Sequence, residues 1–171
     1  MLWAVSTLRW DLDTSVSPIR LSIIVGDANT LFFDGSELCD KVSYIDFAEP
    51  FTLELRSALQ QQCESILPSN QFSAAGTYAC TQGPRLESAA EICRIRRDGA
   101  DIVGMTLMPE AALARELKLR YASICAVANW AAGIDPQGLV MEEVLATLEG
   151  ALSRVELVVA GVIKCLSPPS P

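Results

Sequence analysis

The sequence predicts an α/β fold with a mainly parallel (mixed) sheet flanked by helices. From residue 77 onward, short apolar runs alternate with stretches of helical periodicity, and this order is typical of parallel strands joined by helices. Half of the 171 residues are hydrophobic and a fifth are charged, as in one compact domain. We therefore expect a single domain over residues 1–166 and a flexible tail over residues 167–171.

The first predicted elements are a strand and a helix. Residues 20–25 (RLSIIV) are rich in β-branched side chains, and residues 27–29 after them are typical of a turn. Residues 49–67 carry apolar side chains every three to four positions, and Pro68 follows directly. This spacing predicts an amphipathic helix that the proline ends.

Three further strands are predicted, and the first two are each followed by a helix. The last helix is long, because its apolar stripe recurs at the helical period from Met141 to Leu166. The strands are expected at residues 77–80, 101–105 and 121–127, and the helices between them at residues 86–98 and about 109–117.

Ligands of such sheets lie at the carboxyl ends of the strands. The loops at these ends hold no base that is placed to activate a serine or a cysteine. Their polar groups suit a chemistry of hydrogen bonding and electrostatic placement. The loops span residues 81–87, 106–110 and 128–133, and the candidate groups in or beside them are Glu87, Met105, Thr106, Glu110 and Asn129.

Each of these groups also has a purely structural interpretation. Glu87, which is expected on the first turn of a helix, suits the positive end of the helix dipole. Thr106 suits a helix cap, and Asn129 suits a turn. Met105 suits core packing. From the residues alone, the structural and functional interpretations both stay open.

Charge and termini exclude several classes of function. The net charge is −8 and the basic residues are scattered, which argues against nucleic-acid binding because phosphate backbones are bound by clustered cations. No basic region precedes an apolar stretch at the amino terminus, so no signal peptide is expected. No apolar run approaches the roughly 20 residues of a membrane span. We therefore expect a cytoplasmic protein without membrane contact.

The cysteine and histidine content argues against a metal site. The six cysteines are widely spaced without a C-x-x-C pair, and there is no histidine. A zinc finger or a histidine-based triad is therefore not expected, and buried reduced thiols are the favoured interpretation.

Three sequence strings carry a family resemblance. They are "YACTQGPRLESAAE", "GADIVGMTLMPEAALARELKL" and "YASICAVANWAAG", with "YIDFAEPF" and "LVMEEVLATL" extending the match. The chain resembles the trimeric purine nucleoside phosphorylases, in particular the methylthioadenosine and methylthioinosine phosphorylases. The second string is the most specific, because a strand ending in Gly-Met-Thr is followed after two residues by Pro-Glu.

The resemblance implies a reaction and two catalytic residues. Inorganic phosphate, as co-substrate and without any cofactor, attacks the anomeric carbon of a purine nucleoside, and the base leaves. Asn129 is implied to bind the N7 and O6 edge of the purine, and Glu87 to accept from N1–H. An ionised carboxylate only accepts hydrogen bonds, which suits a 6-oxopurine better than adenine.

The resemblance also implies a binding site that is completed in a homotrimer. Tyr44 is implied to reach into the sugar site of the neighbouring subunit, and Thr106 to hold phosphate with the help of backbone N–H groups at the start of the next helix. Met141 stands where related enzymes hold the 5'-hydroxyl with histidine, and a methionine packs well against a methylthio group. For the base and ribose, the implied contacts are Leu86, Val103 and Met105.

The amino-terminal part departs from the family pattern. Nothing corresponds to the first glycine-rich phosphate loop, and Ser6 and Thr7 stand where a second such segment has glycines. The expected fold is therefore nucleoside phosphorylase-like but N-terminally truncated. The expected function is phosphorolysis of 5'-methylthioinosine, or of methylthioadenosine, in purine salvage. The alternatives are an inactive purine- or nucleoside-binding or assembly protein, a start site that hides a longer enzyme, or a fragment without function.

Overall fold

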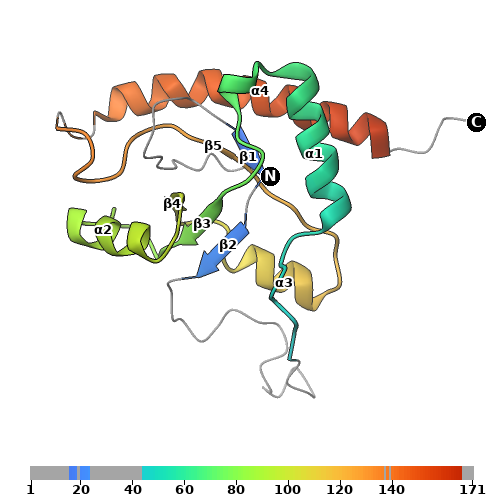
Figure 1. Ribbon diagram of the computed structural model, residues 1–171, viewed down its shortest axis with the longest axis horizontal. Helices are drawn as coiled ribbons and strands as arrows, with labels where there is room; N and C mark the ends of the chain where they lie inside the picture. The colour runs from blue at the N-terminus through green and yellow to red at the C-terminus, as the bar shows by residue number, and fades with distance from the viewer. Residues whose placement is uncertain (1–15, 19, 24–43, 137, 139, 167–171) are drawn as a thin grey trace, which may run out of the picture.

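The computed structural model describes residues 16–18, 20–23, 44–136, 138 and 140–166. The predictions for residues 4–7, for the turn at 27–29 and for the tail at 167–171 lie outside these residues. Figure 1 shows the elements in chain order: β1 (Val16–Pro18), β2 (Arg20–Ile23), α1 (Leu53–Ile66), a 3-10 turn (Ser69–Gln71), β3 (Thr77–Cys80), α2 (Ala89–Arg97), β4 (Ile102–Gly104), α3 (Glu110–Glu116), β5 (Ile124–Ala126) and α4 (Met141–Leu166).

The strands form two small sheets. β2, β3 and β4 are parallel and neighbour one another in that order, with Tyr78 opposite Ile102. This confirms the predicted α/β class with parallel strands. β5 pairs antiparallel with β1 instead, with Ser17 opposite Cys125. The predicted strand 121–127 is therefore shorter than expected, because the backbone of Tyr121 bonds to Thr52 and not to another strand.

The two faces of the parallel sheet are covered by different helices. Tyr78 and Cys80 of β3 pack in a cluster with Ala111 of α3. Ala79 between them packs in a second cluster with Ile92 of α2. This alternation follows from the period of two along a strand. The sheet is therefore the middle layer between α2 and α3, and the loops after β3 and β4 emerge at one edge of it.

A third apolar cluster joins the two longest helices. Leu59 and Cys63 of α1 pack with Ala151, Val155 and Val158 of α4. Figure 1 shows α4 running along one side of the molecule with α1 beside it. The predicted start of α4 is confirmed, whereas α1 begins at Leu53, four residues later than predicted, with Thr52 at its N-cap.

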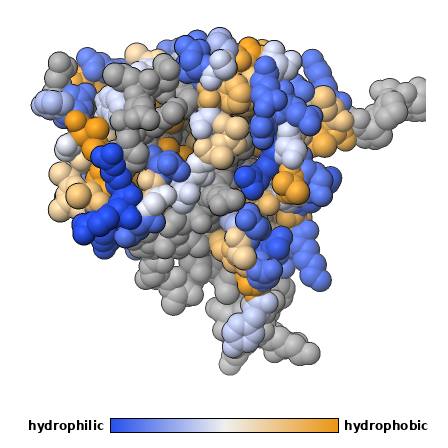
Figure 2. Space-filling model, viewed as in Figure 1, coloured by the Kyte–Doolittle hydropathy of each residue, from blue (hydrophilic) through white to orange (hydrophobic). Residues whose placement is uncertain are grey.

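The thiols and the surface differ in part from the expectation. All five described cysteines are free, but only Cys63, Cys80 and Cys125 are buried, whereas Cys93 and Cys165 are exposed. Cys39 lies outside the described residues. Figure 2 shows strongly hydrophilic atoms over α2, where Arg94, Arg96 and Arg97 are exposed. Within the described part of the chain, no helix is both long and apolar enough to cross a membrane.

Candidate active site

Two of the loops at the carboxyl ends of the parallel strands contact each other directly. The N–H of Thr81, just after β3, donates to the carbonyl oxygen of Gly104 at 2.8 Å. The side chain of Met105 lies against Gly83, where an added Cβ would be 2.8 Å from the Met105 sulfur. Only glycine fits at position 83 without moving Met105, so the first two predicted loops pack closely together.

The loop after β5 joins the same region from the side of α2. Ala131 is buried in one cluster with Val103 of β4 and Ile92 of α2. Gly133 has a positive φ of 80°, and a Cβ there would lie 2.5 Å from the Cβ of Ala89. The fold therefore brings the three loops that the sequence singled out to one edge of the sheet.

The start of α2 corrects the expected position of Glu87. The helix begins at Ala89 with Ser88 as its N-cap, so Glu87 precedes the helix and is not on its first turn. Ser88 and Glu91 form a capping box, in which the Ser88 N–H donates to the Glu91 carboxylate at 2.8 Å. Glu91 is thus the carboxylate at the helix terminus. The prediction that Glu87 lies on the first turn of the helix is wrong.

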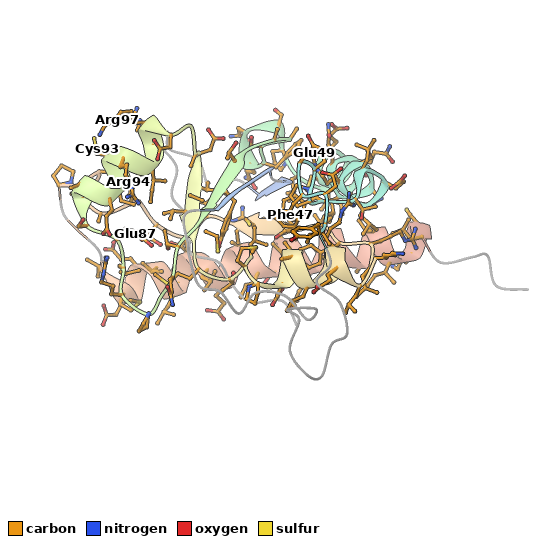
Figure 3. All side chains as sticks on the ribbon, turned by 90° about the horizontal axis from the view of Figure 1, so that it is seen from below. Phe47, Glu49, Glu87, Cys93, Arg94 and Arg97 are labelled. Carbon is orange, nitrogen blue, oxygen red and sulfur yellow. The ribbon has the colours of Figure 1, made fainter. Side chains whose placement is uncertain are left out.

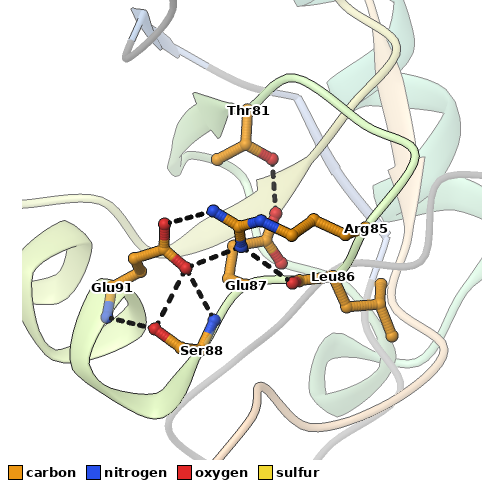
Figure 4. A network of polar contacts seen from close by, with 6 residues as sticks. All are labelled: Thr81, Arg85, Leu86, Glu87, Ser88 and Glu91. Carbon is orange, nitrogen blue, oxygen red and sulfur yellow. Dashed lines mark hydrogen bonds and ion pairs between the residues drawn. The ribbon is translucent and has the colours of Figure 1, made fainter.

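An ion pair fixes the same turn from outside. Both terminal nitrogens of Arg85 donate to Glu91, at 2.8 and 2.7 Å, and one of them also donates to the carbonyl oxygen of Leu86 at 3.1 Å (Figure 4). The hydrogen bond from the Arg85 guanidinium holds the pKa of Glu91 well below its usual range. The hydrogen bonds of Arg85 go to Glu91 and Leu86, and its interaction with Glu87 is a longer-range charge attraction.

Glu87 has a different partner. Its side chain is half-buried, and its Oε1 accepts a hydrogen bond from the hydroxyl of Thr81 (Figure 4). Among the described residues, no hydrogen bond is made to the second carboxylate oxygen, Oε2. Thr81 was not among the residues predicted from the sequence. The signal that could have identified it is a hydroxyl directly after β3.

The side-chain oxygen of Asn129 accepts no hydrogen bond from the described residues. Its Nδ2 donates to the carbonyl oxygen of Trp130 at 2.8 Å. Its Oδ1 is buried and has no hydrogen-bond partner within the described residues. A buried acceptor left unpaired costs about 1–3 kcal/mol. The carboxamide is therefore suited to accept from an N–H group that a ligand brings.

Tyr78 is a further residue that sequence analysis missed. Its side chain is fully buried, and its hydroxyl oxygen accepts from the N–H of Thr106 at 3.3 Å. Burial raises the pKa of Tyr78 above its usual range. Thr106 itself is half-buried and lies four residues before α3. Its N–H is therefore already engaged by Tyr78, and its side chain also interacts with the Tyr78 hydroxyl.

The other candidate residues differ in exposure. Val103 is buried and Met105 is half-buried, whereas Leu86 and Met141 are each 51% exposed. Figure 1 shows that α4, which Met141 begins, starts on the same side of the molecule as α2. Tyr44 is 96% exposed.

The segment that holds Tyr44 lies apart from the loop cluster. Phe47 and Glu49 of this segment are well separated from Glu87 in Figure 3. Glu110, the remaining loop carboxylate, accepts from the Tyr121 hydroxyl at 3.0 Å. Within the described residues of one chain, Tyr44 and Glu110 are thus not joined to the group of Glu87, Met105 and Asn129.

The chain is similar to known proteins of one family. The profile of the Phosphorylase superfamily matches residues 22–164. A probable S-methyl-5'-thioinosine phosphorylase from Thermodesulfovibrio yellowstonii is 48% identical over 126 residues, which are 74% of this chain and 47% of the relative. A probable 6-oxopurine nucleoside phosphorylase from Thermococcus kodakarensis is 42% identical, over 78% of this chain and 50% of the relative.

Solved structures show the same fold. Methylthioadenosine phosphorylase from Schistosoma mansoni in complex with adenine superimposes with a TM-score of 0.86 at 23% identity, covering 98% of this chain and 65% of that one. The chain spans about half the length of the curated relatives it matches.

Proposed function

The chain belongs to the Phosphorylase superfamily, and we propose that it acts in the phosphorolysis of a purine nucleoside, with 5'-methylthioinosine as the favoured substrate and methylthioadenosine as the second. An oxygen of inorganic phosphate forms a bond to the anomeric carbon as the bond from that carbon to N9 breaks. The electron pair leaves with the purine, which takes up a proton. The products are the free base and 5-methylthioribose 1-phosphate.

The unpartnered Oδ1 of Asn129 is the observation that carries the proposal. The departing purine gathers negative charge and is neutralised by protonation at a ring nitrogen. A buried amide oxygen without a partner accepts from that new N–H. Glu87, held at the same edge of the sheet, accepts from N1–H of a 6-oxopurine through its unoccupied Oε2. These two acceptors match a base that carries two ring N–H groups.

The sugar and phosphate contacts complete the proposed site. Val103 and Leu86 line the base pocket, and Met105 lies under the ribose. Thr106 binds phosphate through its hydroxyl. Met141 packs against the methylthio group, because a flexible thioether suits an apolar sulfur substituent better than a hydroxyl. Names of relatives such as S-methyl-5'-thioinosine phosphorylase support this choice of sugar.

We also propose that the protein assembles as a trimer in the cytoplasm. The exposed ring of Tyr44 supports a role in a neighbouring subunit, since it makes no contact with the loop cluster of its own chain. The five free cysteines among the described residues suit a reducing compartment.

One observation favours a second candidate function, namely purine or nucleoside binding without catalysis. The N–H of Thr106 donates to Tyr78 and is not available to an anion. The loops described here thus offer a phosphate few donors. In this alternative, the base and sugar contacts are kept and the protein binds nucleoside or serves as an assembly partner.

Release of hypoxanthine from 5'-methylthioinosine by the purified chain, with and without phosphate, tests the proposal. We expect release that depends on phosphate, and an Asn129→Ala variant that loses most of it. The apparent Kd for the nucleoside is measured in parallel. Nucleoside binding that phosphate leaves unchanged, with no release of base, would instead support the binding protein and exclude the enzyme.

A further inference from the structure

The hydroxyl of Thr81 has two acceptors within reach and one proton to donate. One acceptor is Oε1 of Glu87, and the other is the carbonyl oxygen of Gly104 at 3.4 Å. The Gly104 oxygen already accepts the N–H of Thr81 at 2.8 Å. Hydrogen bonds to an ionised acceptor are about twice as strong as those between neutral groups. The Thr81 hydroxyl therefore donates its hydrogen bond to Glu87 and not to Gly104.

Thr81 is itself held by the sheet. Its backbone N–H donates to Gly104, the last residue of β4, and so continues the hydrogen bonding between β3 and β4 one residue past the end of β3. A hydroxyl on such a fixed backbone has a defined position, and a partner that it binds is oriented by the sheet and not by a loop. A hydrogen bond thus links the Glu87 carboxylate to Thr81, which lies six residues earlier in the chain, at the end of β3.

The backbone of Glu87 is held from the other side. The carbonyl oxygen of Leu86, the preceding residue, accepts a hydrogen bond from the Arg85 side chain. Ser88, the following residue, is the N-cap of α2 (Figure 4). The three torsion angles of the Glu87 side chain are not fixed by its backbone. The hydrogen bond from the Thr81 hydroxyl fixes them. With Oε1 occupied, Oε2 accepts no hydrogen bond from the residues that the structure describes and is the oxygen left to accept from a ligand.

We propose that Thr81 is a positioning residue that determines base specificity through Glu87. By taking up Oε1, its hydroxyl orients Oε2 to accept from a ring N–H, which a 6-oxopurine has at N1 and a 6-aminopurine lacks. The inference rests on the proposed function, because it names how the same site selects its base. Thr81 does not touch the substrate.

Two substitutions separate the hydroxyl from the shape of the side chain. Thr81→Val keeps the branched shape and removes the hydroxyl, whereas Thr81→Ser keeps the hydroxyl. We expect Thr81→Val to lower kcat/KM for 5'-methylthioinosine about tenfold, mainly through KM, and to change kcat/KM for methylthioadenosine less than about twofold. Thr81→Ser is expected to keep the preference of the unaltered protein for 5'-methylthioinosine over methylthioadenosine. Thr147→Val, which removes a hydroxyl bonded to the Glu143 carbonyl on α4, is the matched control and leaves both values unchanged.

The ratio between the two substrates distinguishes positioning from a merely structural role. Equal losses with both substrates, or failure of Thr81→Ser to keep the ratio, would overturn the inference while leaving the proposed function intact. If the unaltered protein neither releases base nor binds nucleoside, the proposed function fails, and base selection by Thr81 fails with it.

A readout without ligand tests the contact by itself. The melting temperatures of Thr81→Val, Glu87→Ala and the double variant form a mutant cycle. We expect the two changes to be non-additive, since each removes the same hydrogen bond. Additive shifts would overturn the inference even if the enzyme is active.

Discussion

Glu87 and Glu91 are four residues apart and take opposite roles because their neighbours differ. Glu91 is engaged by Arg85 and by the N–H of Ser88, so its charge is used within the protein. Within the described residues, Glu87 accepts one hydrogen bond, from Thr81, and its other oxygen is the one proposed to bind the base. The carboxylate that the protein leaves unsatisfied is the better candidate for recognition.

Asn129 provides a test of base selection at a single residue. Asn129→Asp is expected to shift the ratio of kcat/KM from 6-oxopurine toward 6-aminopurine nucleosides, because a carboxylate accepts from an exocyclic amino group where the amide donates. Initial rates with 5'-methylthioinosine and methylthioadenosine give the ratio. Asn70→Asp, on an exposed 3-10 turn away from the loops, is the control. An unchanged ratio would remove Asn129 from the base site.

The described cysteines provide a test of burial and of pH dependence. Burial raises the pKa of Cys63 to about 11 and that of Cys125 to about 12. In a Cys39→Ser background, we expect a thiol reagent at pH 8 to modify Cys93 and Cys165 and to spare the buried thiols until the protein unfolds. Mass spectrometry of labelled peptides identifies the sites.

The same two pKa shifts determine how stability depends on alkaline pH. The folded protein keeps these thiols protonated above the ordinary cysteine pKa of 9.0. Their contribution to stability is complete below that value and is lost as pH rises from about 9 toward 11 and 12. Rapid labelling of Cys63 or Cys125 in the native protein at pH 8 would contradict both expectations.

At the scale of the element, α2 depends on the turn that precedes it. Ser88 satisfies a backbone N–H at the helix start, and its own N–H is satisfied by Glu91. Arg85 in turn holds Glu91, so the cap, the ion pair and the loop that bears Glu87 form one unit. Anything that loosens the cap therefore also loosens the candidate site.

Removal of the cap tests this unit. Ser88→Ala is expected to lower the free energy of unfolding by about 1 kcal/mol, whereas Ser88→Thr keeps the capping oxygen and changes it little. Urea unfolding followed by circular dichroism measures both. Because the folded pKa of Glu91 is lowered, its contribution is present above the unfolded pKa of about 4.3 and is lost as pH falls below it. Equal stability of Ser88→Ala and the parent at pH 7 would show that the cap is dispensable.

At the scale of the whole molecule, the loop cluster and Tyr44 are separate parts of one chain. Glu87, Met105 and Asn129 lie at one edge of the parallel sheet, and Tyr44 lies in a segment apart from it with its ring almost fully exposed. In the proposed assembly of several copies, both parts would serve one site.

Mixed assemblies test this arrangement. Tyr44→Ala and Glu87→Ala are each expected to lower the rate of phosphorolysis at least tenfold, the first by losing a contact to the neighbouring sugar site and the second by losing the base acceptor. Coexpression of the two variants is expected to restore part of the activity, since some sites then combine an intact Tyr44 with an intact Glu87. Activity no higher than the sum of the separate variants would exclude a shared site. Light scattering checks that assembly is unchanged.

The sequence by itself determined the order of the helices and of strands β2 to β5, the mainly parallel class of the sheet and the family, but it missed β1 and the 3-10 turn. β3 was predicted to the residue, because a run this short, flanked by a glycine and by polar residues, favours a strand over a helix. Helix α4 was predicted from its first residue, since a stripe that long fits no other structure. Such local patterns depend on near neighbours in the chain, and these are visible in the sequence.

Only the tertiary structure decided which polar groups are used up within the protein and which remain for a ligand. The pairing of Thr81 with Glu87, the engagement of Thr106 by Tyr78 and the unpartnered oxygen of Asn129 all depend on atoms from different loops. The antiparallel pairing of β5 with β1 is equally non-local. Hydrogen bonds reach about 3 Å and depend on orientation, so sequence spacing cannot fix them, and the packed fold does.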